Sequence, residues 1–343
     1  MARPWTRHNG AVRPRLPFAN PTTEPRDSFD PYAGADPAVV AEALADAVPE
    51  VYWTDPAHRP QRPEPRPVLH GARTAAGAER RADLVVIGGG FTGLWAALQA
   101  LEDDPGRSVV VLEAGRLGTG ASGRNGGFVS SSLTHGLAQG AALWPDELPT
   151  LERLGTENIA GLEASLTAYG IDADFHRPGE LTLSLTPNQD AAITEGYELH
   201  RAHGLPAELL DGDTARARVD SPLYRGGWFD PSVALVDPGR LVWGLAAAIE
   251  SLGGTIHEGS PATGLAVDGA GVRVTTTAGA IRADRVVVGT NAYPGVLKRL
   301  RAFILPVYDH VLMTEPLTPA QLAAVGWQGR EGLTDAGNQF HYY

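Results

Sequence analysis

Hydrophobic residues first gather in two short runs on either side of an amphipathic stretch. Residues 84–87 (Leu-Val-Val-Ile) are too few for a helix and predict a buried strand. After a glycine turn, apolar residues recur with helical spacing at Leu94, Ala97, Leu98 and Leu101. The run at 109–112 (Val-Val-Val-Leu) follows the turn Asp104-Pro105-Gly106. This order of signals predicts a βαβ unit.

Helix and strand signals alternate farther along the chain. Helices are predicted by periodicity over 148–169, by a capping box at Thr186–Gln189 and by Asp237-Pro238 ahead of 241–252. A strand is predicted over 181–185. We expect a β-meander in 255–288, from four short apolar runs at 255–258, 262–267, 272–277 and 285–288. Further strands are predicted over 306–314 and 338–343, with a Thr-Pro-x-Gln cap at Thr318 between them.

The N-terminal part differs in composition from the rest. Residues 1–36 are rich in proline and scattered charges and predict an extended arm, and a short helix begins at Pro37. A polar, proline-rich linker is expected over 55–81. The first 30 residues lack the apolar run of a secretory signal, and glycines interrupt the one apolar stretch at 84–101. We therefore expect a cytoplasmic protein with no membrane span.

Composition and charge narrow the classes of function. A chain of 343 residues, 43% of them hydrophobic, predicts about two globular domains. The net charge of −12 disfavours nucleic acid and anionic membrane as partners. The absence of cysteine excludes disulfides, thiolate zinc sites, iron–sulfur clusters and a cysteine nucleophile. The ten histidines show no metal-binding spacing, so no metal site is expected.

A glycine motif lies between the first strand and the first helix of the βαβ unit. Residues 88–93 read Gly-Gly-Gly-Phe-Thr-Gly and match G-x-G-x-x-G. Gly88 would make the tight turn, Gly90 would let the backbone approach a pyrophosphate, and Gly93 would let helix and strand pack closely. Glu113 ends the second strand, where an acid accepts hydrogen bonds from an adenosine ribose. This context predicts a dinucleotide site and disfavours NADP.

A second glycine-rich segment helps to choose between NAD and FAD, which share the adenosine diphosphate half. Residues 115–127 contain six glycines together with Ser122, Arg124 and Asn125. Such a loop offers backbone N–H donors and a guanidinium along a further anionic stretch. FAD fits this pattern better than NAD, while a plain solvent-exposed glycine loop is the alternative.

These motifs resemble the FAD-dependent oxidoreductases of the D-amino-acid oxidase, glycine oxidase and sarcosine oxidase group, and within it the gamma-glutamylputrescine oxidase-like proteins. The resemblance is carried by 83–93, 112–115 and 120–127, and it continues through 177–181, 236–238, 286–292, 305–307 and 314–317. It implies an α/β fold with a Rossmann-like FAD-binding domain of the glutathione-reductase type. An α+β substrate domain with a mainly antiparallel sheet would complete it.

The same resemblance implies domain boundaries and cofactor contacts. The FAD-binding domain would comprise 81–170 and 226–296, and the substrate domain 171–225 and 297–343, after an arm and linker over 1–80. The FAD would be non-covalent, because the loop 120–127 lacks the histidine or cysteine that attaches flavin in some members. The implied FAD-binding residues are Gly88, Gly90, Phe91, Thr92, Gly93, Glu113, Ala114, Ser122, Arg124, Asn125, Gly126, Gly127, Ala262, Gly289 and Thr290.

The implied reaction is the oxidation of a carbon–nitrogen bond of an amine or amino acid to an imine. Hydride would pass to flavin N5, and O₂ or another acceptor would reoxidise the flavin. Tyr308 and His310 share one face of the expected strand 306–314 and could cage an amine or take its proton. His135 follows a serine run near the flavin-side glycines. Ordinary sheet positions for Tyr308 and His310, and a turn position for His135, are the alternatives.

The last residues of the sequence are aromatic and read as a strand without a closing turn. Members of the resembled family continue beyond this point with a helix N-terminus that faces the flavin, so we expect the sequence to be incomplete. Two other functions stay open. One is an FAD-binding protein without catalytic activity, and the other is an NAD-dependent dehydrogenase built on the same βαβ unit.

Overall fold

The fold is given by a computed structural model. It describes residues 37–43, 45, 50–55, 59, 61–73, 75, 78–269, 271–293, 296–307, 311–337 and 341–343. Contacts divide the chain into two units, residues 1–48 and 49–343. In the first unit, helix α1 (Pro37–Ala43) begins at the proline that predicted it. The predicted arm over 1–36 lies outside the described residues.

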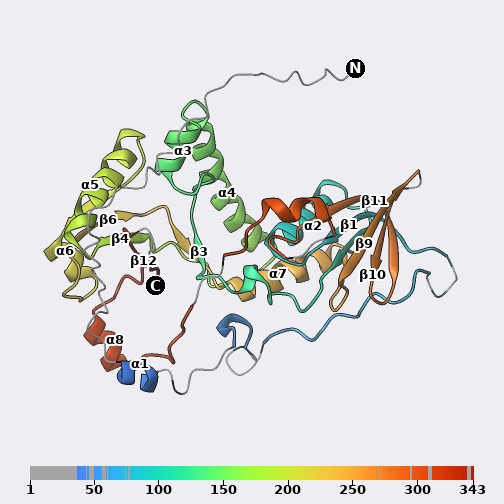
Figure 1. Ribbon diagram of the computed structural model, residues 1–343, viewed down its shortest axis with the longest axis horizontal. Helices are drawn as coiled ribbons and strands as arrows, with labels where there is room; N and C mark the ends of the chain where they lie inside the picture. The colour runs from blue at the N-terminus through green and yellow to red at the C-terminus, as the bar shows by residue number, and fades with distance from the viewer. Residues whose placement is uncertain are drawn as a thin grey trace. The chain divides into compact units, whose positions relative to one another are not determined.

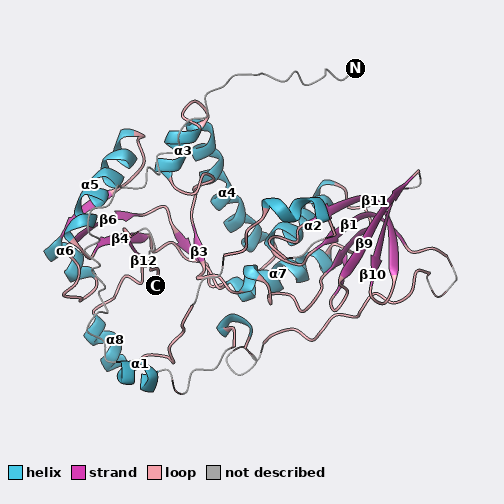
Figure 2. Ribbon diagram, viewed as in Figure 1, coloured by secondary structure: helices cyan, strands magenta, loops and turns pink. Residues whose placement is uncertain are grey.

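The second unit contains a six-stranded sheet (Figures 1 and 2). Its strand order is β8-β2-β1-β11-β10-β9, and the first four strands are parallel. The predicted βαβ unit is confirmed as β1, α2 (Phe91–Asp103) and β2. The strands are β1 (Arg81–Ile87), β2 (Val109–Leu112), β8 (Thr255–His257), β9 (Ala262–Asp268), β10 (Gly271–Thr276) and β11 (Ala280–Val288).

The predicted meander over 255–288 is correct for three of its four strands. β9, β10 and β11 are antiparallel neighbours, but β8 pairs in parallel with β2 at the opposite edge of the sheet. The sequence of a short apolar strand does not show whether the strand pairs in parallel or antiparallel, because buried parallel strands and short antiparallel strands have similar composition. The sequence therefore could not separate β8 from the meander.

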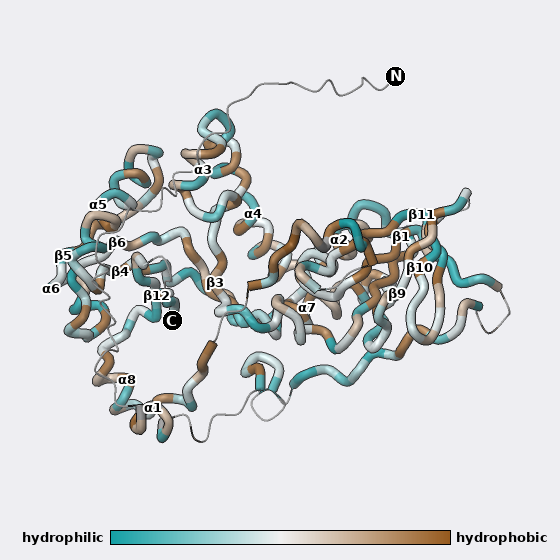
Figure 3. Tube along the Cα trace, viewed as in Figure 1, coloured by the Kyte–Doolittle hydropathy of each residue, from teal (hydrophilic) through white to brown (hydrophobic). Residues whose placement is uncertain are grey.

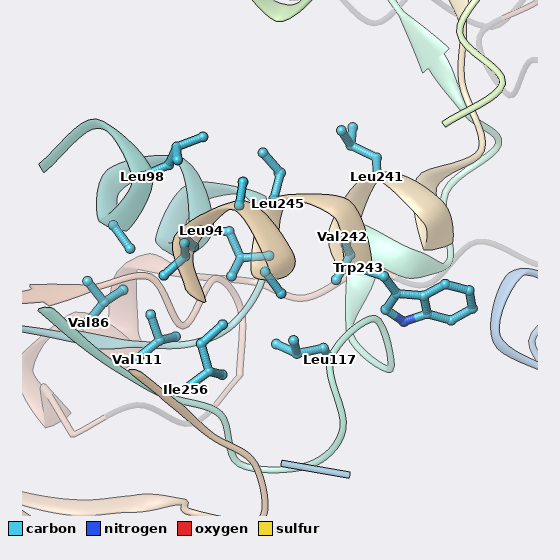
Figure 4. Close-up of a cluster of buried hydrophobic side chains, with 14 of the residues drawn as sticks. Val86, Leu94, Leu98, Val111, Leu117, Leu241, Val242, Trp243, Leu245 and Ile256 are labelled. Carbon is cyan, nitrogen blue, oxygen red and sulfur yellow. The ribbon is translucent and has the colours of Figure 1, made fainter. Parts of the chain in front are cut away.

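Two helices bury one face of the large sheet. Val86, Val111 and Ile256 occupy one row across β1, β2 and β8, and all three are at most 2% exposed. Helices α2 and α7 (Pro238–Ser251) cover this row and contact each other. Figure 4 shows this cluster, with side chains from α2 (Leu94, Leu98) and from α7 (Leu241, Val242, Trp243, Leu245). Such burial is the main stabilising contribution of the βαβ unit.

The opposite face of the large sheet has its own core. Val85, Ile87 and Leu112 pack there with residues of β10 and β11. Leu69, in the segment that was expected to be a linker, joins this core and is 1% exposed. Because both faces of β1 are buried, its last four residues are all apolar, as Figure 3 shows by the hydrophobic colour of this strand.

A smaller sheet carries a second core. Its order is β12-β4-β6-β5, with antiparallel pairing except between β12 and β4. The strands are β4 (Glu180–Ser184), β5 (Glu208–Asp211), β6 (Gly226–Asp230) and β12 (Gly332–Asp335). By its pairing β6 belongs to this sheet, whereas the sequence assigned residues from 226 onward to the FAD-binding part. Its core contains Leu181 and Leu183, both fully buried.

Three helices begin at the predicted caps. In α5, Thr186 and Gln189 form the capping box, and Asp237 caps α7 by accepting a hydrogen bond from the Arg240 amide. Thr318 and Gln321 form another capping box. The elements are α3 (Leu137–Leu143), α4 (Leu148–Ala168), α5 (Pro187–Ala202), α6 (Gly212–Arg218), α8 (Pro319–Val325), and the two-strand pair β3 (Phe128–Val129) and β7 (Ala234–Leu235).

The strand predicted over 306–314 does not form in its described residues. Residues 306–307 and 311–314 have no strand partner, and Val307 and Leu312 are 82% and 74% exposed. Alternating apolar residues form a strand only when a neighbouring strand takes their backbone hydrogen bonds. At the end of the chain, Tyr343 exchanges two backbone hydrogen bonds with Leu333 of β12, while residues 338–340 lie outside the described part.

Truncating the core between α2 and the sheet should destabilise the protein. Leu98→Ala removes a fully buried side chain, so we expect the free energy of unfolding to fall by about 2–5 kcal/mol. Urea denaturation followed by circular dichroism measures it. Leu209→Ala, at a position of β5 that is 46% exposed, is the control and should change stability by less than about 0.5 kcal/mol. Equal losses in the two variants would contradict the assignment of this core.

Candidate functional site

A cavity of about 550 Å³ opens where the carboxyl ends of β1, β2 and β11 meet. Ligands of open α/β sheets bind at this edge, outside the carboxyl ends of parallel strands. Five segments line it: the first glycine turn, the turn after β2, the second glycine loop, the start of β9 and the end of β11. The volume is typical of a small-molecule or cofactor site.

The first glycine turn requires its missing side chains. Gly88 has a φ of +105°, and a Cβ there would lie 2.5 Å from the carbonyl oxygen of Gly289. A Cβ on Gly93 would overlap the carbonyl oxygen of Gly88 and press on Val86. The turn therefore lets α2 begin against the end of β1, as the spacing of the motif predicts.

The N-terminus of α2 presents backbone amides to the cavity. The Phe91 amide donates to the Ser122 hydroxyl oxygen at 2.9 Å. In the part of the chain that the structure describes, the amides of Gly90 and Thr92 have no acceptor, and both residues line the cavity. A helix of 13 residues adds the positive end of its dipole at this point. These donors suit a phosphate group.

Glu113 connects the first glycine turn with the turn after β2. One carboxylate oxygen accepts a hydrogen bond from the Gly89 amide and the other from the Gly115 amide, both at 2.8 Å. Each oxygen retains a further lone pair. The carboxylate is thus fixed at the edge of the cavity, at the position where dinucleotide sites hold the adenosine ribose.

The second glycine loop contributes a cation to the cavity wall. Arg124 is exposed, and its Nε donates to the Thr119 carbonyl oxygen at 2.7 Å. Among the described residues no carboxylate forms an ion pair with Arg124. A guanidinium with free donors beside a cavity can neutralise an anionic ligand.

The structure brings most of the predicted cofactor residues together. Eleven of the fifteen line the cavity: Gly88, Gly90, Phe91, Thr92, Glu113, Ala114, Ser122, Arg124, Ala262, Gly289 and Thr290. The other four, Gly93, Asn125, Gly126 and Gly127, do not line it. Their contacts instead fix the conformation of the segments that line the cavity. Asn125, for example, accepts the Gly127 amide at 2.9 Å through its side-chain oxygen.

Several lining residues were missed by the sequence interpretation. Asn291 and Tyr293 follow the predicted pair Gly289 and Thr290 directly, and Asn291 has a φ of +45°. The position of these residues just beyond a buried parallel strand was the available signal. Tyr293 also borders a second cavity of about 700 Å³, whose other walls include the apolar side chains Leu297, Leu300 and Ile304.

The predicted catalytic residues are not assembled in the described part of the chain. Tyr308 and His310 lie outside the described residues. His135 is exposed, does not line the cavity, and has a φ of +59° in a turn where the Ser132 hydroxyl accepts the Gly136 amide at 2.8 Å. This geometry matches the turn alternative for His135.

The smaller sheet carries a pair of carboxylates on adjacent strands. Glu180 of β4 lies opposite Asp230 of β6, and the Thr334 hydroxyl donates to Glu180 at 2.9 Å. Burial, together with the charge of Asp230, raises the pKa of Glu180 above its usual value of 4.5 against the opposing effect of the Thr334 hydrogen bond. In the same region burial raises the pKa of Glu152 on α4.

Neither a metal-binding cluster nor a membrane-spanning helix is present among the described residues. No three or more histidine, aspartate or glutamate side chains there are grouped so that they could hold a metal ion. Among the helices of the same residues, none combines the length and the apolar character needed to cross a membrane.

The fold and this cavity are typical of dinucleotide-binding α/β proteins, and comparison with known proteins identifies the family. Residues 83–343 match the model of the DAO family, described as FAD dependent oxidoreductase. The chain belongs to this family. The expected fold class is confirmed by this match and by the solved structure of glycine oxidase from Geobacillus kaustophilus, which superposes with a TM-score of 0.55 at 22% identity over 65% of this chain and 59% of that one.

Two curated relatives are similar to this chain in sequence. The probable oxidoreductase OrdL of Haemophilus influenzae is 34% identical over 70% of this chain and 57% of its own length. Gamma-glutamylputrescine oxidoreductase of Escherichia coli is 36% identical over 69% of this chain and 55% of its own length. The chain thus spans little more than half the length of these relatives.

The carboxylate pair of the smaller sheet predicts a dependence of stability on pH. Since folding raises the pKa of Glu180, its contribution to stability is complete below the unfolded value of 4.5 and is lost as the pH rises through the folded value. Glu180→Gln removes the titrating carboxyl group, so the variant does not lose this stability as the pH rises. We expect the variant to gain thermal stability relative to the parent protein as the pH rises from about 4 to 8 in thermal unfolding scans.

The control for this prediction is Glu195→Gln, at an exposed position of α5. It should follow the stability of the parent protein across the same pH range. A difference between Glu180→Gln and the parent protein that stays constant with pH would show that burial does not shift the titration of Glu180.

Proposed function

We propose that the chain binds FAD without a covalent bond and serves the oxidation of a carbon–nitrogen bond of an amine or amino acid to an imine. The observation that carries this proposal is the convergence of two glycine-rich segments and Glu113 on one cavity at the carboxyl edge of the large sheet. Membership of the FAD dependent oxidoreductase family supports the choice of cofactor.

The donors and acceptors of the cavity fit the parts of FAD. The free amides of Gly90 and Thr92 would take the pyrophosphate, which the α2 dipole also favours. Glu113 would accept hydrogen bonds from the adenosine ribose, and its negative charge would repel a 2′-phosphate. Arg124 would offset negative charge farther along the ligand.

The length of the lined surface favours FAD over NAD. After the adenosine side, the wall of the cavity continues through residues 118–122 and Arg124 of the second glycine loop. Non-covalent binding is supported by chemistry, because the chain has no cysteine and no histidine lines the cavity among the described residues.

The protein's part in the reaction would be to hold the reactants and exclude water. When bound, FAD supplies the two-electron acceptor for amine oxidation, and water hydrolyses the imine afterwards. The amine nitrogen must be deprotonated before it can release its electrons, so a nearby proton acceptor assists. Tyr308 and His310 remain the proposed substrate-side residues because an aromatic ring and an imidazole could cage an amine or take its proton. O₂ or another acceptor would complete the cycle.

The purified chain tests the proposal directly. We expect a yellow protein with the absorption bands of oxidised flavin, and we expect acid precipitation to release all of this flavin into the supernatant. Anaerobic addition of amines and amino acids should bleach the bands when a substrate is present. A protein that stays colourless after incubation with FAD, but binds NADH, would support a dehydrogenase instead.

A side chain at Gly90 should prevent the close approach of the diphosphate. A Cβ there would already lie 2.9 Å from the Ser122 hydroxyl oxygen, so Gly90→Val fills the space beside the α2 amides. We expect the Kd for FAD to rise at least about tenfold, which corresponds to 1.4 kcal/mol. Quenching of FAD fluorescence on titration with flavin-free protein measures this constant.

Gly264→Val is the matched control, because a Cβ at this position of β9 meets no atom within 4 Å. It should bind FAD as the parent protein does. Similar losses of affinity in both variants would mean that the effect comes from lowered stability and not from the cavity.

A further inference from the structure

The segment before β1 is packed onto the large-sheet unit at several points. We call its described residues 50–55, 59 and 61–73 the clasp. Thr54 and Leu69 are 5% and 1% exposed, and Gly71 forms a parallel bridge with Gly279 next to β11. Although this segment is rich in proline and charged residues, the clasp thus follows an ordered path along the domain. It is not a free linker.

Trp53 of the clasp bonds the second glycine loop. Its indole Nε1 donates to the carbonyl oxygen of Asn125 at 2.9 Å, across 72 residues of sequence. The Asn125 side chain holds the loop from within, because its amide donates to the Ser122 carbonyl oxygen at 3.0 Å. The Ser122 hydroxyl in turn accepts the Phe91 amide at the start of α2. One chain of hydrogen bonds and covalent linkages therefore joins Trp53 to the amides that face the cavity.

Arg59 fixes the position of Trp53. Its guanidinium lies 4.5 Å from the ring centre of Tyr52 and 5.5 Å from that of Trp53, and it forms an ion pair of 3.1 Å with Asp237. Asp237 is 4% exposed and caps α7. The carboxylate therefore places the clasp against the start of this helix.

The start of α7 also holds the second glycine loop. The Val236 amide donates to the carbonyl oxygen of Gly127 at 2.9 Å. Gly239, in the first turn of α7, has no side chain, and a Cβ there would lie 2.5 Å from the Trp53 carbonyl oxygen. The indole of Trp53 and the Val236 amide, just before α7, thus hold the same loop at two points.

The clasp contacts the adenosine side of the cavity as well. The buried carboxylate of Glu258 accepts the Arg66 amide at 2.7 Å and the Leu117 amide at 2.6 Å. The Ser260 hydroxyl accepts the Leu69 amide at 2.9 Å, while the Ser260 amide donates to the Glu113 carbonyl oxygen at 2.8 Å. Removing the indole bond alone leaves these contacts in place.

We propose that Trp53 is a positioning residue for the flavin side of the FAD site, an inference that rests on the proposed function. Its indole holds the Asn125 end of the second glycine loop in the binding conformation before the cofactor arrives. A loop that is ordered in advance loses less conformational entropy on binding. Deleting one such hydrogen bond should weaken FAD binding about three- to tenfold.

The test compares Trp53→Phe with the parent protein in the full chain. Phenylalanine keeps an aromatic ring beside Arg59 and removes the N–H donor together with one ring of the indole. The matched control is Trp144→Phe, at a tryptophan that is 43% exposed and does not line the cavity. Hydrogen–deuterium exchange of flavin-free protein should show faster exchange over residues 118–127 in Trp53→Phe only, with unchanged exchange in β1.

Binding measurements separate positioning from a general loss of stability. We expect the Kd for FAD to rise three- to tenfold in Trp53→Phe, while the Kd for AMP, which occupies only the adenosine half, stays within twofold of the parent value. Equal weakening of FAD and AMP would overturn the proposal, and so would an unchanged Kd for FAD.

A second variant and exchange measured on flavin-free protein distinguish failure of the Trp53 proposal from failure of the proposed function. If Trp53→Phe loses protection throughout β1, Arg59→Lys takes its place, since lysine keeps a cation near Asp237 but loses the planar group beside the rings. The exchange over 118–127 and the Kd values for FAD and AMP are then measured on Arg59→Lys, and the same results would support or overturn the proposal. If the parent protein binds no FAD, the proposed function fails. Unchanged exchange over 118–127 in flavin-free Trp53→Phe contradicts the role of Trp53 independently of that result.

Discussion

The close approach of α2 to the end of β1 is the constraint on which the site depends. Gly93 lies so near the carbonyl oxygen of Gly88 that no side chain fits between them. Because the helix begins there, its first amides point at the edge of the sheet where β1 and β2 end. Burial of α2 against Val86 and Val111 supplies the free energy that holds this arrangement.

Charged side chains around the cavity add to the hydrogen-bond donors that the backbone supplies. Glu113 is held by two amides at the edge of the cavity, and Arg124, which also lines the cavity, forms no ion pair with a carboxylate of the described residues. An anionic ligand would thus meet a negative group at one end and positive groups along its length. Under the proposed function, this arrangement would favour a nucleotide with hydroxyls at one end and phosphates next to them.

Local chemistry made much of the fold predictable. The βαβ unit followed from two apolar runs and helical spacing, and the caps at Thr186, Asp237 and Thr318 appear where their side chains predicted helix starts. The glycine spacing and Glu113 located the cavity because each acts within one supersecondary unit. Fold and family membership both agree with that interpretation.

Features set by distant partners could not be predicted in the same way. The pairing of β8 with β2 and the burial of Leu69 depend on residues more than 100 positions away. The alternation over 306–314 predicted a strand, yet a strand requires a neighbour that its own residues cannot supply. Trp53 belongs to no sequence motif that could have marked it. Its contact with Asn125 arises only from the folded path of the clasp.

A crystal structure of the chain with bound flavin would test the central claim most directly. We expect the pyrophosphate to lie within hydrogen-bonding distance of the Gly90 and Thr92 amides, and the Glu113 carboxylate to accept hydrogen bonds from the adenosine ribose. A flavin bound elsewhere, or a pyrophosphate that leaves these amides unpaired, would contradict it.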